Sequence, residues 1–257
     1  MVAESQITAR RDIAIKAARR AGRMLSDCFG RIRKISAKGD RNLVTDIDLA
    51  AERIIKSQII KNFPQDSILS EENPYEQKSE FKWIIDPLDG THNYIHNIDI
   101  FGVSVALAYK DEVVVGIIYM PRKDELYFAR KDKGAYLNGK RISVSKRKIR
   151  EATLIFDSSI RYQKNRMLKG LGELVDRVFN VRMFGSTVRG LTYIAEGKAE
   201  AEVEYNDKLW DFAAGLLLIE EAGGRCTDHS GRRWNIKTRG YIASNAKIHN
   251  EVLTLIK

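Results

Sequence analysis

Apolar residues recur every three or four positions near the start of the chain, which is the spacing of one face of a helix. Ile7, Ala14, Ala18 and Leu25 mark this face, and basic residues fill much of the other. The pattern predicts a long amphipathic helix over residues 4–29.

A second helix is predicted over residues 46–62. Thr45 is a favourable N-cap, Asp48 places an acid in the first turn, and Phe63-Pro64 ends the element. Between the two helices, residues 31–44 are polar and contain glycine, which indicates a hairpin or a mobile loop.

Runs of apolar and β-branched residues follow and predict a sheet. A short strand over 67–70 stops at two glutamates. The strand over 81–85 stops at Asp86-Pro87, because a proline nitrogen cannot donate to a ladder. Three more strands, separated by polar breaks, are predicted over 101–109, 113–120 and 125–130.

The pattern changes after about residue 152, where strands alternate with helices. Such alternation implies a second sheet that is covered by helices. No linker rich in proline, glycine or serine separates the two patterns. We therefore expect one domain over 1–257, with an N-terminal half of about 1–150 and a C-terminal half of about 151–257. The predicted strands are 153–156, 181–184 and 199–204, and the predicted helices are 162–178, one that follows Gly185-Ser186, and 211–222.

Composition excludes several classes of protein. Of the 257 residues, 44% are hydrophobic and 30% are charged, which excludes a disordered chain. The two cysteines, Cys28 and Cys226, lack the CxxC spacing, which argues against a disulfide framework and a zinc finger and favours a reducing compartment. No apolar run approaches the ~18 residues of a membrane helix. The charged N-terminal segment lacks the apolar region of a signal peptide, so we expect a cytoplasmic protein.

The chain carries 44 basic and 34 acidic side chains, a net charge of +10. The sharpest basic run, residues 140–150, has six basic residues among eleven. An exposed strand edge with its loop has this composition. A nucleic-acid site would need interleaved aromatic residues or a known helix motif, and the run has neither. We therefore favour the solvated edge and keep nucleic-acid binding as the alternative.

Candidate chemistry is concentrated where the strand over 81–85 ends. Asp86 and Asp89 stand three positions apart. Gly90 permits a positive φ, and Thr91 can begin a helix whose free N–H groups point outward. Carboxylates hold hard cations through oxygen, and N–H groups hold anions. A phosphate bridged by Mg²⁺ ions fits both, while a turn with capping acids is the structural alternative.

Three further segments place polar groups at the ends of elements, where α/β folds build their sites. Glu71 follows a strand, Asp211 begins a helix, and Gly185-Ser186-Thr187 opens a helix directly after a strand. Each has an alternative role in capping or packing. Bound metal ions would remove the repulsion among such carboxylates, lower the pKa of an attacking water and neutralise a leaving alkoxide.

These segments resemble the inositol monophosphatase family of Mg²⁺-dependent, lithium-sensitive sugar phosphatases. The resemblance covers nearly the whole chain. It rests on Ser70-Glu71-Glu72, on the segment from Trp83 to Thr91 and on Trp210-Asp211-Phe212-Ala213-Ala214-Gly215, in that order and at the family's spacing. A weaker match, Leu43-Val44-Thr45-Asp46-Ile47-Asp48, is similar to the segment that supplies another active-site aspartate.

The resemblance implies a set of metal ligands. Glu71, Asp86 and the carbonyl of Leu88 would bind the first ion. Asp86, Asp89 and Asp211 would bind the second, and Glu71 would also help to hold a third. The family's cofactor is Mg²⁺, at about two to three ions per site.

The resemblance also implies roles toward water and substrate. Thr91, paired with Asp48, would orient and deprotonate the attacking water, and Thr91, Asp48 and Glu71 form the predicted catalytic set. The N–H groups of Gly90 and Thr91 would hold phosphate oxygens. The loop Lys38-Gly39-Asp40 would match the family's mobile flap. The substrate side would be lined by Asp89, Gly90, Thr91, Gly185, Ser186, Thr187, Glu204 and Asp211.

Two residues depart from the family pattern and leave the substrate open. His92 stands where a second threonine is usual, and we expect it on a helix face or at a subunit contact rather than on the substrate. Arg189 lies where many members have small residues. It would reach a second phosphate or an acidic partner, or lie at the surface, which is the position we favour.

The resemblance implies a layered α/β (α+β) fold, an α-β-α-β-α sandwich with the site between its two sheets, and a homodimer. It implies hydrolysis of a small phosphorylated sugar or polyol, and inositol 1-phosphate is the substrate we expect. The alternatives are fructose 1,6-bisphosphate, alone or as a second activity, and 3′-phosphoadenosine 5′-phosphate. The alternative outside enzymes is a basic nucleic-acid-binding protein on a phosphatase scaffold, against which the complete set of acids argues.

Overall fold

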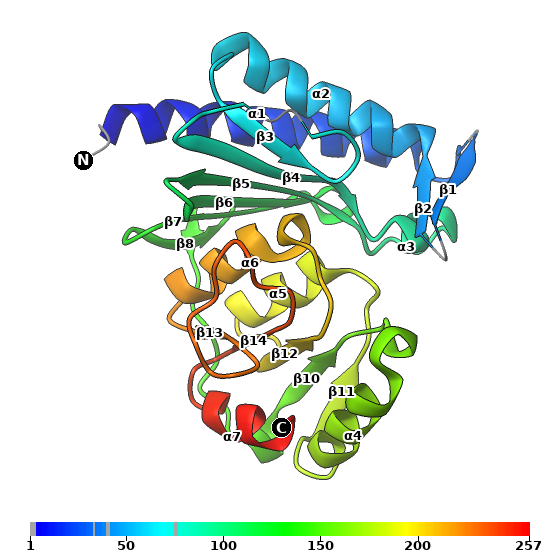
Figure 1. The fold of residues 1–257 in the computed structure, drawn as a ribbon, viewed down its shortest axis with the longest axis vertical. Helices are drawn as coiled ribbons and strands as arrows, with labels where there is room; N and C mark the ends of the chain where they lie inside the picture. Colours follow the sequence, from blue (N-terminus) through cyan, green and yellow to red (C-terminus); the bar gives the residue numbers. More distant parts are fainter. Residues whose placement is uncertain (1–3, 33, 40–41, 75–76) are drawn as a thin grey trace.

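Five layers of helix and sheet stack on one another in the computed structural model, which describes residues 4–32, 34–39, 42–74 and 77–257 (Figure 1). Helices α1 and α2 form the first layer, a 7-stranded sheet the second, α5 and α6 the third, a 5-stranded sheet the fourth, and α4 and α7 the fifth. The α-β-α-β-α order predicted from the sequence is confirmed.

Helix α1 (Glu4–Cys28) matches the first predicted helix, and its small apolar face packs on the 7-stranded sheet together with α2 (Asp46–Asn62). The side chain of Thr45 accepts from the first N–H groups of α2, and the Asp48 carboxylate accepts from the Thr45 N–H, so the predicted N-cap is part of a capping box. Strands β1 (Ile35–Gly39) and β2 (Asn42–Thr45) form an antiparallel hairpin before α2, as predicted. Asp40, the last residue of the predicted flap, lies outside the described residues.

The 7-stranded sheet has the order β3-β4-β5-β6-β7-β8-β9, with β3 parallel to β4 and every other pair antiparallel. The prediction that its second strand ends at Asp86-Pro87 is wrong, because β4 continues to Asp89. The register with β5 shifts between Asp86 and Asp89, so Pro87 sits in an irregularity that tolerates a missing donor. The strands are β3 (Ser67–Ser70), β4 (Phe81–Asp89), β5 (Gly102–Tyr109), β6 (Glu112–Met120), β7 (Glu125–Arg130), β8 (Gly134–Leu137) and β9 (Lys140–Arg141).

The 5-stranded sheet has the order β11-β10-β12-β14-β13, in which β10 is parallel to both of its neighbours. The predicted strand over 181–184 is shifted, because the observed strand covers Asn180–Arg182. No element was predicted after residue 222, where two strands and a helix occur. The strands are β10 (Thr153–Phe156), β11 (Asn180–Arg182), β12 (Ala201–Glu204), β13 (Arg225–Asp228) and β14 (Tyr241–Ser244), and the helices are α4 (Lys164–Val175), α5 (Thr187–Ala195), α6 (Leu209–Glu221) and α7 (His249–Leu255).

Three apolar cores separate the layers. The largest holds α5 and α6 between the two sheets and contains Val188, Leu191, Phe212 and Leu216. Both helices begin at the same end of this layer, where β4 also ends (Figure 1). The core thereby fixes the positions of the residues that begin α5 and α6.

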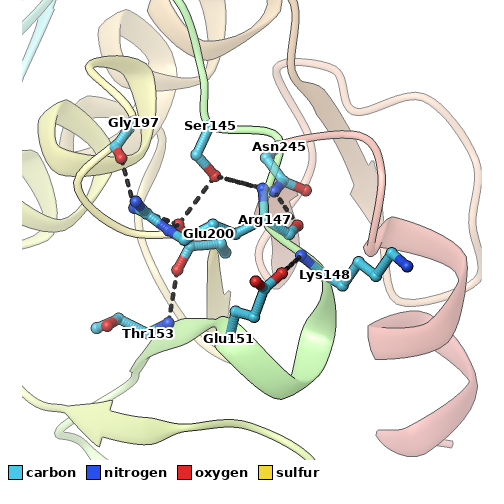
Figure 2. Close-up of polar contacts among 8 residues, drawn as sticks. All are labelled: Ser145, Arg147, Lys148, Glu151, Thr153, Gly197, Glu200 and Asn245. Carbon is cyan, nitrogen blue, oxygen red and sulfur yellow. Dashed lines mark hydrogen bonds and ion pairs between the residues drawn. The ribbon is translucent and has the colours of Figure 1, made fainter.

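Part of the basic run over 140–150 makes hydrogen bonds next to the second sheet, so the run is not solvated along its whole length. Its first two residues form β9, the edge strand of the first sheet, as predicted. Figure 2 shows that Arg147 instead reaches Glu200, which is fully buried: Nε lies 2.7 Å from Oε1. Ser145 Oγ donates to the same oxygen at 2.9 Å, and the N–H of Thr153 donates to Oε2 at 2.6 Å. The prediction of a solvated edge is therefore incomplete for Arg147.

Two further observations concern the predictions from composition. Cys28 and Cys226 are both free thiols. None of the helices in the described part of the chain combines the length and the apolar character that a membrane crossing needs.

Candidate active site

A cavity of about 200 Å³ opens where the two sheets and the middle helices meet. Eight of its nineteen lining residues carry a carboxylate, and none of the nineteen is lysine, arginine or histidine. The sequence placed four of the acids here as metal ligands and one as a substrate contact. The eight are Glu71, Asp86, Asp89, Asp157, Glu202, Glu204, Asp207 and Asp211.

Thr91 and Asp48 lie in hydrogen-bond contact at the edge of this cavity. Thr91 Oγ1 is 2.9 Å from Asp48 Oδ1 and 3.0 Å from the carbonyl oxygen of Leu88. Both partners are acceptors, so the hydroxyl hydrogen is used on the protein side and the oxygen lone pairs are left for another donor. Asp48 is itself held by the N–H of Thr45 at 2.8 Å and is fully buried. Burial raises the pKa of Asp48. The hydrogen bonds from Thr45 and Thr91 lower this pKa, but by less than burial raises it.

Asp89 joins two of the segments that the sequence singled out. Its carboxylate accepts from Ser186 Oγ and from the N–H of Thr187 at 3.1 Å. Ser186 is the N-cap of α5, so Asp89 and the helix N-terminus share one polar cluster. Burial raises the pKa of Asp89 to about 7, although these hydrogen bonds lower it.

Asp86 lies on β4, and Glu71 directly follows β3, the parallel strand that pairs with β4. Asp86 is 2% exposed and accepts from the N–H of Leu88 at 3.0 Å. Burial raises its pKa well above the usual range, and the charges of Glu71, Asp89 and Asp211 raise it further. The N–H of Glu71 donates to the carbonyl of Ile85 at 3.2 Å, which continues the β3–β4 pairing to the end of β3.

Asp211 enters the cavity from the first turn of α6. Its carboxylate accepts from the N–H of Lys208 at 2.8 Å and so caps the helix that carries it. Burial, followed by the charges of Asp207 and Glu71, raises its pKa well above the usual range. The capping role that the sequence offered as an alternative is real, and it leaves the second carboxylate oxygen for another partner.

Gly90 occupies a position that a larger residue would disturb. Its φ is +82°, and a Cβ there would lie 2.8 Å from the carbonyl oxygen of Ile100. The next residue begins α3 (Thr91–Ile95), as predicted. Asn93 on this helix donates to the carbonyl of Phe184 at 2.8 Å and so fixes the segment that leads to Gly185. Sequence reasoning missed Asn93, because no local pattern marks a side chain that acts on the backbone of a distant loop.

The side-chain chemistry of the cavity fits a hard divalent cation. Glu71, Asp86, Asp89 and Asp211 offer only oxygen donors, which Mg²⁺ and Ca²⁺ prefer. Their mutual repulsion and loss of hydration are the conditions that a bound cation relieves. Within the described residues, however, no three acidic, histidine or cysteine side chains are already gathered into a metal-holding group. The carboxylates line the cavity without forming a complete coordination site. Their side chains would reorient when an ion binds.

Three lining acids were not predicted. Asp157 follows β10 much as Asp86 follows a buried run in β4, and this was a signal that sequence reasoning could have used. Glu202 alternates with the predicted Glu204 on β12, so both side chains lie on one face of the strand. Asp207 lies in the loop before α6, where no pattern marks it.

The two departures from the family pattern lie outside the cavity lining. Arg189 is 4% exposed and donates to Glu125 at 2.9 Å, so the surface position favoured from the sequence is wrong and the acidic partner is found within the chain. His92 is exposed on α3 and stacks on His96 with ring centroids 4.4 Å apart. This position agrees with the predicted helix face, and a subunit contact stays a prediction.

The sequence profile described as the inositol monophosphatase family matches residues 7–256. The chain belongs to the inositol monophosphatase family. A Thermotoga maritima protein named fructose-1,6-bisphosphatase/inositol-1-monophosphatase is 34% identical over 249 residues, which cover 96% of this chain and 95% of that protein. A Pseudomonas aeruginosa protein named Nus factor SuhB is 34% identical over 258 residues, which cover 96% of this chain and 95% of that protein.

Solved structures agree with this membership. The crystal structure of the extragenic suppressor protein suhB from Bartonella henselae superposes with a TM-score of 0.93 at 33% identity, covering 97% of this chain and 98% of that one. As a member of the inositol monophosphatase family, the chain is a phosphoric monoester hydrolase that acts on a small phosphorylated substrate. Enzymes of the family generally depend on metal ions, and the oxygen-only donors of the cavity suit that dependence.

Proposed function

We propose that the protein hydrolyses a small phosphate monoester with Mg²⁺ ions, and that inositol 1-phosphate is a substrate. The observation that carries the proposal is the contact of Thr91 with Asp48 at the rim of a cavity lined by eight carboxylates. The hydroxyl and the buried carboxylate form a chain along which a proton can leave an attacking water.

The residues that would hold the ions are those expected from the sequence. Glu71, Asp86 and the carbonyl of Leu88 would hold one ion, and Asp86, Asp89 and Asp211 a second, with Glu71 available to a third. When bound, such ions make water a stronger acid and neutralise the charge of the leaving alkoxide.

The chain's own groups position the reactants. The lone pairs of Thr91 Oγ1 accept a proton of the attacking water, and the Thr91 hydroxyl passes its own proton to Asp48 Oδ1, 2.9 Å away. The N–H groups of Gly90 and Thr91 hold phosphate oxygens at the start of α3. Positioning and charge stabilisation account for most of the rate enhancement, because phosphoryl transfer needs little covalent catalysis by the protein.

The organic part of the substrate would lie against the start of α5 and the end of β12. Ser186 and Thr187 already lie against Asp89 there, and Thr187 Oγ1 also donates to Asp207 at 3.1 Å. Together with Gly185, Glu204 and Asp211, these groups offer the donors and acceptors that substrate hydroxyls require.

Two other activities are favoured by the names of relatives. The Thermotoga maritima relative is named for fructose 1,6-bisphosphate as well as inositol 1-phosphate, so the bisphosphate is the second candidate substrate, ahead of 3′-phosphoadenosine 5′-phosphate. A relative named Nus factor keeps the nucleic-acid alternative open for a chain of net charge +10. Nucleic-acid binding would show as an affinity that falls steeply with salt. A homodimer and a cytoplasmic location are part of the same proposal.

The test is phosphate release from inositol 1-phosphate, fructose 1,6-bisphosphate and 3′-phosphoadenosine 5′-phosphate, with Mg²⁺ and with EDTA. We expect release that requires Mg²⁺ and is fastest with inositol 1-phosphate. Release that persists in EDTA would contradict the metal mechanism. Faster release from one of the other two compounds would identify that compound as the preferred substrate.

A further inference from the structure

The cavity holds a second group of carboxylates that the proposed metal ligands do not include. This group consists of Asp157, Glu202, Glu204 and Asp207 and is contributed by the 5-stranded sheet and its loops. Asp157 is used within the protein, because it accepts from the N–H groups of Ser159 at 2.5 Å and Tyr205 at 3.2 Å. Asp207 accepts from Thr187 and, at 3.3 Å, from the hydroxyl of Tyr241.

Glu202 differs from the others because part of its carboxyl group has no partner. Its side chain is 1% exposed and lines the cavity, and Oε2 has no hydrogen-bond partner among the described residues. Helix α5 makes room for it, since a Cβ at Gly190 would lie 2.3 Å from Glu202 Oε1. A buried polar oxygen without a partner costs free energy unless something bound in the cavity satisfies it.

The charge of the cavity indicates what that bound group is. Eight carboxyl groups line the cavity, and a bound phosphate would add further negative charge. No lysine, arginine or histidine is among its lining residues to offset this charge. A second phosphate on the substrate would add two more negative charges next to Glu202 and Asp207. A positively charged substituent would offset them instead.

We propose that this cavity selects a phosphate monoester whose organic part carries a protonated amine, held between Glu202 and Asp207. The inference rests on the proposed phosphatase function and names the class of its preferred substrate. An ammonium group has three donors, which suit the open oxygen of Glu202 and the carboxylate of Asp207. The same reasoning disfavours fructose 1,6-bisphosphate, because its second phosphate, outside the metal site, would meet no basic side chain among the lining residues.

The pKa values of the two acids agree with this assignment. Burial raises the pKa of Glu202 well above its usual range, and the charge of Asp207 is the next largest cause. Loss of hydration in the cavity raises the pKa of Asp207 to about 8, with the charge of Asp157 adding to it. A positive charge beside the two carboxyl groups would stabilise their ionised forms, and an ammonium group would supply that charge.

The test compares pairs of monoesters that differ in one substituent. Glucosamine 6-phosphate and glucose 6-phosphate share a ring and differ by an ammonium in place of a hydroxyl, and 2-aminoethyl phosphate and 2-hydroxyethyl phosphate form a second, smaller pair. We expect kcat/KM of the Mg²⁺-loaded enzyme at pH 7 to favour the amine in at least one pair by about tenfold or more. Ratios at or below one in both pairs would overturn the proposal and would instead indicate recognition of hydroxyl groups.

Variants then locate the recognition. In Glu202→Gln and Asp207→Asn the amine-to-hydroxyl ratio should fall toward one, while Glu151→Gln, an exposed acid outside the cavity, should keep the wild-type ratio. A preference that survives both cavity substitutions would show that the amine binds elsewhere and would contradict the assignment. Far-UV circular dichroism of each variant identifies loss of fold.

A last arm separates this inference from the proposed function. If inositol 1-phosphate is hydrolysed while neither amine is preferred, the function stands and the amine site is wrong. If no monoester is hydrolysed, the function fails, and calorimetry with glucosamine and glucose in the presence of Mg²⁺ and phosphate still decides the amine site. Tighter binding of glucosamine would support it, and equal binding would overturn it.

Discussion

The hydroxyl of Thr91 is the most constrained reactive group at the residue scale. It lies between two acceptors, Asp48 Oδ1 at 2.9 Å and the Leu88 carbonyl at 3.0 Å, so its orientation is set before any substrate arrives. We expect Thr91→Ala to lower kcat by roughly 10²–10⁴-fold, the range for a positioned proton acceptor. Steady-state kinetics with inositol 1-phosphate provide the measurement.

Thr91→Ser is the matched control, because it keeps the hydroxyl and removes a methyl group. Its kcat should return to within about tenfold of the wild type. An alanine variant with unchanged kcat would remove Thr91 from the mechanism. A serine variant as slow as the alanine one would indicate that Thr91 acts through packing.

Asp207 predicts how stability depends on pH in the metal-free protein. Its pKa is raised from 3.8 to about 8 in the folded state, mainly by loss of hydration. Between those values the unfolded chain loses a proton that the folded chain keeps, so the free energy of unfolding should fall as pH rises from about 4 to 8. Urea unfolding in EDTA at pH 5 and pH 8 measures this change.

In Asp207→Asn the fall should be smaller, since the amide does not titrate. The free energy of unfolding of the variant should therefore increase relative to that of the wild type as pH rises. Parallel pH curves for the two proteins would show that Asp207 ionises as easily in the folded state as in the unfolded one.

At the scale of elements, buried acidic side chains hold loop segments in place where there are no helix or sheet hydrogen bonds. Glu200 accepts from Arg147, Ser145 and the N–H of Thr153, and joins the connection between the sheets to β10 and β12 (Figure 2). Glu200→Ala would leave these donors without their acceptor. We expect a loss of about 3 kcal/mol in the free energy of unfolding, measured by urea titration.

Glu151→Ala is the control, because Glu151 is a nearby exposed acid that accepts from the N–H of Lys148 and, among the described residues, makes no contact with Glu200 (Figure 2). Its cost should stay below about 1 kcal/mol. Equal costs for the two substitutions would contradict the importance given to burial of Glu200.

The sequence predicted elements where the signal was local. The helix over 4–29 and the N-cap at Thr45 follow from periodicity and from capping chemistry, and both are confirmed. The end of β4 was misplaced, because Pro87 forbids a regular ladder but not an irregular one. Arg189 was placed at the surface, because its partner Glu125 lies on a strand 64 positions away.

The candidate site shows the same division. Glu71, Asp86, Asp89 and Asp211 were named together from motif spacing, and all four line one cavity. Glu202 and Asp207 were missed, since their proximity depends on how β12 and the loop before α6 pack beside α5. Spacing along the chain identifies residues that belong to one motif. It does not show which distant segments pack side by side.

At the scale of the whole molecule, the two sheets each contribute one side of the cavity. The first sheet supplies Glu71, Asp86 and Asp89, and the second supplies Asp157 and the acids of β12. The charge that gathers between them opposes the folded state until cations bind. We therefore propose that the two halves act as one domain whose stability is coupled to its metal ions.

This coupling predicts stabilisation by Mg²⁺ without any substrate. Ions that bind only the folded state should add about 2.7 kcal/mol to the free energy of unfolding when their concentration is a hundred times Kd. Thermal unfolding with and without Mg²⁺ tests this, with NaCl at equal ionic strength as the control. The same rise in Tm with both salts would contradict a specific site.

The most direct measurement of the central claim compares Mg²⁺-dependent phosphate release by the wild type, Asp89→Asn and the exposed control Glu151→Gln. An asparagine at 89 keeps an oxygen that can accept from the N–H of Thr187, so the start of α5 should stay in place. We expect the wild type and Glu151→Gln to release phosphate from inositol 1-phosphate only with Mg²⁺, and Asp89→Asn to be inactive with its fold intact. Near-wild-type turnover by Asp89→Asn would contradict the assignment of this cavity as the metal-dependent catalytic centre.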